Sequence, residues 1–168
     1  LQVARRYERS TTFERRDDPV LVNLPRNEGS GAFATFRRTL TQDITKPDAI
    51  EGVVRTLKLV EREDAETGKP ASGKTYDERV RRMALDISSG LGVRLLLDVI
   101  EIIYTNDDPD LMNEVLNEVR ETYIRRTQRR INDLLQQTKD WFEAEQQDRR
   151  AIVEALESDL IQFRTDHR

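Results

Sequence analysis

The segment that decides the fold runs from Asp108 to Arg168 and reads DPDLMNEVLNEVRETYIRRTQRRINDLLQQTKDWFEAEQQDRRAIVEALESDLIQFRTDHR. Asp108 is a favourable N-cap residue, and Pro109 suits the first position of a helix. Neither Gly nor Pro follows before Arg168, so no helix-breaking residue interrupts the segment. The sequence therefore predicts a single helix of about sixty residues, about 90 Å long.

Apolar residues recur along this segment mostly three or four positions apart, which is the spacing of one helix face. The residues of this face are Leu111, Val115, Val119, Tyr123, Ile131, Leu134, Leu135, Trp141, Phe142, Ile152, Val153, Leu156, Leu160 and Phe163, together with Thr138. A small domain cannot stabilise so long a helix by itself, so we expect partner helices from elsewhere in the chain or from other subunits. We expect these packing contacts above all from Leu134, Leu135, Trp141, Phe142, Ile152 and Leu156.

Two strands are predicted before this helix. Residues 5–14 carry β-branched and aromatic residues, and Val93 to Tyr104 is the most apolar run of the chain, which favours a buried strand. We expect both to share a small mixed sheet that brings the start of the chain beside the root of the long helix. The predicted class is α+β, with a base domain over residues 1–108 and the coiled-coil-like long helix over 109–168.

Short helices are predicted to pack on this sheet. One covers Ala32 to Asp43, with Ser30 as a candidate cap; a second begins at Pro47; a third runs from Tyr76 to Gly90. Residues 17–31 are rich in turn formers and predict a loop. Glu61 to Lys74 is charged and contains Gly68, Pro70 and Gly73, so we expect a second surface loop there.

The composition restricts the function classes. Charged and hydrophobic residues each make up 36% of the chain, and the mean hydropathy is -0.73, which favours elongated helices over a globule with a large enclosed pocket. Lys and Arg number 28 against 32 Asp and Glu, for a net charge of -4, which argues against nucleic acid as a partner. Cysteine is absent, and no apolar run is long enough to cross a bilayer. We expect any membrane spans to lie outside these residues.

A phosphate-loop pattern occurs in the second predicted loop. Gly68-Lys69-Pro70-Ala71-Ser72-Gly73-Lys74-Thr75 matches G-x-x-x-x-G-K-[ST], and Leu95-Leu96-Leu97-Asp98 resembles the strand and acid that help to hold magnesium. A working loop follows a buried strand, whereas highly charged residues precede this one. We therefore interpret Gly68, Gly73, Lys74 and Thr75 as a fortuitous match that binds no cofactor.

Other candidate sites have structural explanations that we favour. Arg125, Arg126, Arg129 and Arg130 share one helix face and could bind phosphates, but Glu121 and Asp133 stand four residues away and can neutralise them. His167 is the only histidine and lacks the companions of a metal site or a catalytic triad. Trp141-Phe142 could stack on a sugar, but helix packing explains the pair better. We predict no catalytic residues and no metal site.

Four segments carry a resemblance to a known family. Ile100 to Leu111 (IEIIYTNDDPDL) resembles the strand and "DPD/E-L" helix start of the polysaccharide chain-length determinant family, the Wzz-type polysaccharide co-polymerases. Asn113 to Ile124 resembles that family's "AN-x-hydrophobic-A-x-x-Y-I" segment, and Leu156 to Arg164 its "L-x-x-A-L-x-x-F-R" stretch. Tyr7 to Phe13 is similar to the "Y-x-A-T-A-T" strand that leaves the first membrane span. The resemblance extends over nearly the whole chain.

The resemblance implies a bacterial inner-membrane protein whose two membrane spans flank a periplasmic base and a long protruding helix. Such proteins are homo-oligomers that influence how far a polymerase extends a lipid-linked polysaccharide, by scaffolding rather than catalysis. Some are paired with or fused to a cytoplasmic tyrosine autokinase. No cofactor is implied.

Two other classes remain open. A nucleotide-hydrolysing enzyme would use Gly68 to Thr75 and would bind nucleotide. A coiled-coil adaptor or secretion-channel component would rest on the long helix alone, and it predicts no strand pairing near Tyr7 and Ile102.

Overall fold

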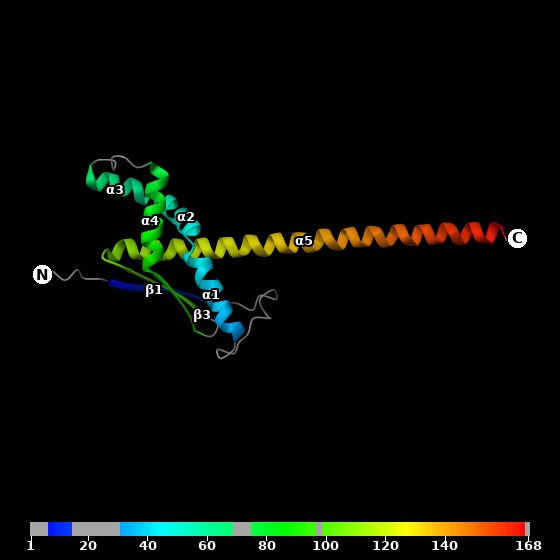
Figure 1. Ribbon diagram of the computed structural model, residues 1–168, viewed down its shortest axis with the longest axis horizontal. Coiled ribbons are helices and arrows are strands. Elements are labelled where there is room, and N and C mark those ends of the chain that lie inside the picture. The colour runs from blue at the N-terminus through cyan, green and yellow to red at the C-terminus, as the bar shows by residue number, and fades with distance from the viewer. Residues whose placement is uncertain (1–6, 15–30, 69–74, 97–98, 167–168) are drawn as a thin grey trace. The chain divides into compact units, whose positions relative to one another are not determined.

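The computed structural model describes residues 7–14, 31–68, 75–96 and 99–166. The chain divides into two compact units, Leu1–Arg126 (unit 1) and Thr127–Arg168 (unit 2). Unit 1 contains a three-stranded sheet and several helices, and the final helix runs into unit 2 (Figure 1), which confirms the predicted α+β class. None of the described helices combines the length and the apolarity that crossing a bilayer requires.

The sheet consists of β1 (Tyr7–Glu14), β2 (Leu91–Leu96) and β3 (Val99–Asn106), in the order β1-β3-β2. β3 pairs with both neighbours, so that Ile102 lies opposite Thr11 on one side and opposite Val93 on the other. The predicted sharing of one sheet by the first and the most apolar segments is therefore confirmed. The prediction of a mixed sheet is wrong, because both pairings are antiparallel.

The apolar run from Val93 to Tyr104 is not one strand, as predicted, but parts of two. β2 ends at Leu96 and β3 begins at Val99, and the two strands pair with each other. A short connection between neighbouring strands allows only the antiparallel arrangement. Continuous hydrophobicity carries no period that would mark a reversal of the chain, which is why the sequence pattern missed it.

Five helices are described: α1 (Gly31–Thr45), α2 (Pro47–Thr56), α3 (Leu59–Thr67), α4 (Tyr76–Gly90) and α5 (Pro109–Asp166). The predicted starts of α2 and α5 at prolines are confirmed. At the start of α5, Asp108 Oδ1 accepts hydrogen bonds from the backbone N–H of Asp110 at 2.9 Å and of Leu111 at 3.2 Å, as expected of an N-cap. Ser30, the expected cap of α1, lies outside the described residues.

The core of unit 1 forms between one face of β3 and the helices. Ile100, Ile102 and Tyr104 alternate along β3, so their side chains point to the same side of the sheet. Buried residues of all five helices complete the cluster: Leu40, Ile44, Ile50, Val53, Val54, Leu59, Val60, Val80, Ala84, Ile87, Met112, Val115, Leu116 and Val119. The first turns of α5 therefore contribute to the core of unit 1.

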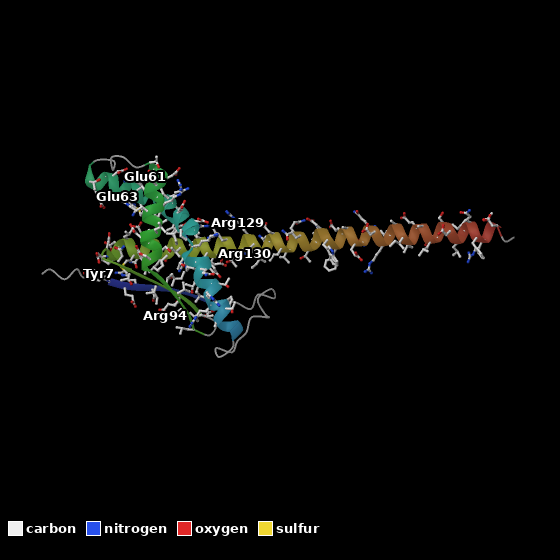
Figure 2. The ribbon with its side chains drawn as sticks, in the orientation of Figure 1. Tyr7, Glu61, Glu63, Arg94, Arg129 and Arg130 are labelled. Carbon is white, nitrogen blue, oxygen red and sulfur yellow. The ribbon has the colours of Figure 1, made fainter. Side chains whose placement is uncertain are left out.

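The segment predicted as a loop from Glu61 onward is helical as far as Thr67, so this prediction is wrong. Arg79 of α4, only 4% exposed, explains the helix. Its guanidinium donates to Asp64 at 2.6 and 2.9 Å and to Glu63 at 3.0 Å, and these hydrogen bonds raise the pKa of Arg79. Glu61 and Glu63 project from α3 in Figure 2. The acidic residues that suggested a solvated loop are thus partly engaged by a neighbouring helix.

Gly90 ends α4, as predicted, but not for the expected reason. A glycine at a helix end usually acts as a cap with a positive φ; among the described glycines, however, only Gly68 has one, at 68°. A Cβ atom at Gly90 would lie 2.9 Å from the backbone oxygen of Thr105 and 3.0 Å from the Tyr104 ring. The glycine is therefore required by the close approach of the helix end to β3.

This close approach predicts that Gly90→Ala destabilises unit 1. The backbone of Thr105 belongs to a strand paired on both sides, so it cannot move away freely, and overpacking of this kind costs about 1 to 3 kcal/mol. Gly52→Ala is the matched control, because Gly52 lies exposed in α2 and a Cβ atom there would have no neighbour within 4 Å. It should stabilise by about 0.5 to 1 kcal/mol through helix propensity.

Both free energies of unfolding can be measured by urea denaturation followed by circular dichroism. Equal effects of the two substitutions would contradict the packing of α4 against β3.

Candidate functional site

The apolar stripe of unit 2 comprises the six residues for which we expect packing contacts: Leu134, Leu135, Trp141, Phe142, Ile152 and Leu156. In the single chain their relative exposures lie between 46% and 63%. By contrast, Met112 and Val115 of the same helix are completely buried in unit 1. Large apolar side chains exposed along one helix mark an interaction surface, so the stripe is the leading candidate for a functional site.

Charged residues interrupt the stripe at its centre. Arg149 Nε donates a hydrogen bond to Glu145 Oε1 at 2.8 Å, one helical turn away. On the N-terminal side of this pair the Trp141 and Phe142 rings meet edge to face, with centroids 4.8 Å apart. These residues line a shallow, open hollow rather than an enclosed pocket. The arrangement can bind another surface, but it offers no enclosed space for a reaction.

The phosphate-loop pattern lies between two helices. Gly68 ends α3 in the left-handed conformation, and Thr75 caps α4 by accepting a hydrogen bond from the backbone N–H of Glu78. Gly73 and Lys74 lie outside the described residues. The element before the pattern is thus a helix, whereas the strand before a nucleotide-binding loop aims its backbone N–H groups at the phosphates. β2, the strand that would supply the magnesium-binding acid, pairs antiparallel with β3.

The arginines at positions 125 to 130 are partly paired, although not as predicted. Arg125 donates to Glu118 at 2.6 Å and to Thr122 at 3.0 Å, whereas Glu121 pairs with Arg120 at 3.1 Å. The predicted pairing of Glu121 with Arg125 is therefore wrong. The long Arg125 side chain instead reaches Glu118, seven residues away. Figure 2 labels Arg129 and Arg130 on the same helix. His167 lies outside the described residues.

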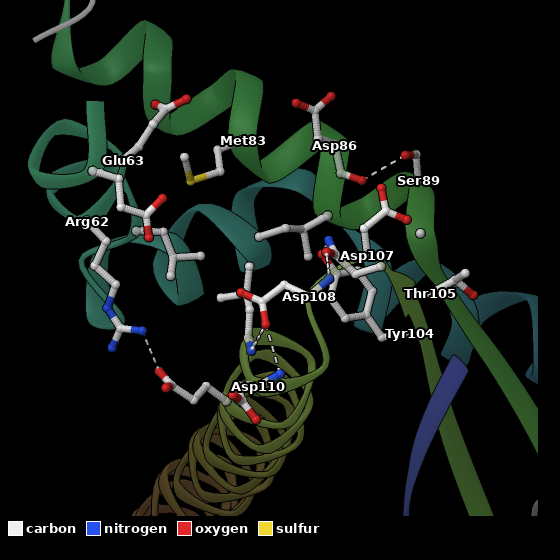
Figure 3. Close-up of a pocket in the computed structure, with 17 residues that line it drawn as sticks. Arg62, Glu63, Met83, Asp86, Ser89, Tyr104, Thr105, Asp107, Asp108 and Asp110 are labelled. Atoms are coloured by element: carbon white, nitrogen blue, oxygen red, sulfur yellow. Dashed lines mark hydrogen bonds and ion pairs between the residues drawn. The ribbon is translucent and has the colours of Figure 1, made fainter. Parts of the chain in front are cut away.

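Unit 1 contains an acidic cleft that the sequence did not reveal. Its volume is about 740 Å³, and its 17 lining residues include seven carboxylates: Glu63, Glu66, Asp86, Asp107, Asp108, Asp110 and Glu114. Figure 3 shows how α3, α4, the end of β3 and the start of α5 supply its walls. The lining residues are separated in sequence, and the pair Asp107-Asp108 gave only a capping signal.

Several groups of the cleft already have partners. Arg62 binds Glu114 at 2.7 Å, and the Asp108 carboxylate caps α5 (Figure 3). Tyr104 Oη accepts a hydrogen bond from Asn106 at 2.8 Å, and burial raises the pKa of this tyrosine. Within the described part of the chain, no group of three or more potential ligands is placed to hold a metal ion. The cleft shows no arrangement of nucleophile, base and orienting group.

Comparisons with known proteins do not assign the chain. No family model matches it, and no curated protein and no solved structure gives a match.

The helical context of the phosphate-loop pattern predicts that Gly68 to Thr75 binds no nucleotide. Calorimetric titration of the chain with ATP and Mg²⁺ should show no heat of binding beyond dilution, and Lys74→Ala should give the same trace. A submillimolar affinity that Lys74→Ala abolishes would contradict this interpretation and would favour the nucleotide-hydrolysing class.

Proposed function

We propose that this chain is the periplasmic part of a bacterial inner-membrane polysaccharide co-polymerase. Its role would be to regulate the chain length or export of a surface polysaccharide, such as an exopolysaccharide, a capsule or an O-antigen. It would act as an oligomeric scaffold for a polymerase and a lipid-linked polysaccharide, without catalysing a reaction itself. Any tyrosine autokinase activity would belong to a separate cytoplasmic domain or partner.

The pairing of β1 with β3 is the observation that carries the proposal. Tyr7, at the start of β1 (Figure 2), lies opposite Asn106, three residues before α5 begins at Pro109. The strand that would leave a preceding membrane span is thereby placed beside the root of the long helix. This is the connection implied by the resemblance of Tyr7–Phe13 and Ile100–Leu111 to the co-polymerase family. The proposal requires membrane spans on both sides of these residues.

The exposed apolar stripe supports the scaffolding role. Burial of one such side chain is worth about 1.5 to 3 kcal/mol, so the six residues together provide a substantial drive for association. The proposed protruding helix would use this stripe to contact helices of neighbouring subunits or of its own chain. Assembly, rather than bond making, would then link this domain to polymer length.

The two alternative classes have less support. A coiled-coil adaptor built on the long helix alone does not predict a sheet, whereas β1 and β3 pair over eight residues. A nucleotide-hydrolysing enzyme needs a strand before its phosphate loop, and α3 occupies that position. Nucleic acid is also disfavoured as a partner, because the net charge is -4.

The scaffolding role predicts a measurable effect of removing two stripe residues in the full-length membrane protein. Leu135→Asp combined with Trp141→Asp should weaken subunit association by about a hundredfold or more, because two buried apolar contacts are lost. The length distribution of the polysaccharide should change, while synthesis of its repeat unit continues. Crosslinking of intact cells and a gel of polymer lengths measure the two effects.

The matched control is Gln136→Asp combined with Gln147→Asp. It adds the same charge to the same helix, but on the face away from the stripe, and it should leave assembly and polymer length as in the wild type. If the stripe variant is folded and abundant and both readouts are unchanged, the stripe is not an assembly surface and the proposal fails.

A further inference from the structure

We infer that residues 127–166 form an antiparallel coiled coil with a second copy of this chain, in the register that places Glu145 opposite Arg149 of the partner subunit. The occupant of the apolar stripe would thus be the same helix, running in the opposite direction. This inference goes beyond the proposed function, because it depends on the pattern of unit 2 and not on a membrane or a polysaccharide.

A seven-residue repeat defines the interface. Leu135, Phe142, Arg149 and Leu156 follow one another at intervals of seven, and so do Ile131, Thr138, Glu145, Ile152 and Asp159. The two series alternate at spacings of three and four, which is the arrangement of the a and d positions of a coiled coil. Both lie in the unbroken helix α5. Two helices that each carry such a seam can bury it against each other.

The charges at the centre of the seam determine the direction of the partner. A parallel pair in register would place Glu145 against the partner's Glu145 and Arg149 against the partner's Arg149, and like charges in an interface are repulsive. An antiparallel pair instead brings a positions against d positions of the other helix. Glu145 then meets the partner's Arg149, and the symmetry of the dimer creates the same contact a second time.

The apolar residues fit the same register. About the two-fold axis that relates Glu145 to the partner's Arg149, Phe142 lies opposite the partner's Ile152. One layer further out, Thr138 lies opposite the partner's Leu156. A shift of one heptad in one direction would place Phe142 against the partner's Glu145. A shift in the other direction would place Leu156 against the partner's Glu145.

The next layer is less favourable, since Leu135 lies opposite the partner's Asp159. It is the fourth layer from the axis, where the carboxylate can remain hydrated beside the leucine. The central six layers therefore contain two ion pairs, two contacts between Phe142 and Ile152, and two contacts between Thr138 and Leu156. Figure 1 shows the helix that would form this interface.

The ion pair within one helix can change partners on association. In the single chain Arg149 binds Glu145 of its own helix at 2.8 Å, and Arg149 is 77% exposed in its side chain. Since the two residues are one turn apart on the seam, each can reach the opposite charge across the axis.

Charge reversal tests the central contact in the full chain of 168 residues. Sedimentation equilibrium should show a concentration-dependent dimer for the wild type. Glu145→Arg and Arg149→Glu should each weaken self-association by about tenfold or more, because each variant places like charges in both central layers. An equimolar mixture of the two variants should associate as strongly as the wild type.

The mixture is its own control for helix stability. Each variant loses the same intrahelical ion pair whether alone or mixed, so restored association reports only contacts between chains. Circular dichroism should show equal helicity in all samples. A wild type that remains monomeric at all accessible concentrations, or a mixture no stronger than its components, would overturn the inference.

Disulfide crosslinking distinguishes the two directions, and the absence of native cysteine leaves no competing thiol. Chains with Thr138→Cys and chains with Leu156→Cys are mixed and oxidised, and the products are separated by mass. The antiparallel register predicts the mixed dimer, because residue 138 lies opposite residue 156 of the partner subunit. Dimers within each variant would indicate a parallel pair, and a lack of any crosslink would exclude a second copy as the occupant of the stripe.

Discussion

The hydrogen bonding of β3 on both sides is the constraint on which unit 1 depends. β1 and β2 each pair with this strand along most of its length, so its backbone polar groups are satisfied and the strand can be buried. Ile100, Ile102 and Tyr104 alternate along β3 and therefore share one face of it, and the helices pack against that face. The same strand leads within three residues into α5, so the position of β3 also determines where the long helix begins.

Ion pairs then decide how the outer helices of unit 1 attach to this core. α3 has only Leu59 and Val60 buried, which is little apolar surface for a helix. Arg79 reaches from α4 to Glu63 and Asp64 and to the backbone oxygen of Val60. A buried guanidinium is costly unless it is paired, so α3 and α4 depend on each other. Arg55 of α2 binds Asp77 of α4 at 2.8 Å and adds a second link.

The helix α5 has two parts with different environments. Met112, Val115, Leu116 and Val119 are buried in unit 1, whereas the apolar residues from Leu134 onward are exposed. A regular helix satisfies its own backbone along its whole length, so the change of environment requires no break in the backbone. Unit 1 has its own buried core, while unit 2 has apolar side chains that are exposed in the single chain. The proposed scaffolding role and the inferred self-association both rest on the exposed side chains of unit 2.

Much of this protein can be read from the sequence, because the relevant signals are local. The start of α5 at Pro109, its cap at Asp108 and the start of α2 at Pro47 all follow from neighbouring residues. The spacing of apolar residues also identified the stripe, and the packing contacts expected of it stay a prediction. Such features depend on backbone geometry within one or two turns, which the residue types largely determine.

Other features were decided only by the tertiary structure. The reversal between β2 and β3 lies within an apolar run that shows no period. α3 forms among acidic residues because Arg79, fifteen residues or more away in sequence, neutralises them. Gly90 is needed because Thr105 and Tyr104 approach it from another strand, and the acidic cleft assembles residues of several elements. In each case the cause is a contact between distant residues, whose free energy exists only once the chain has folded.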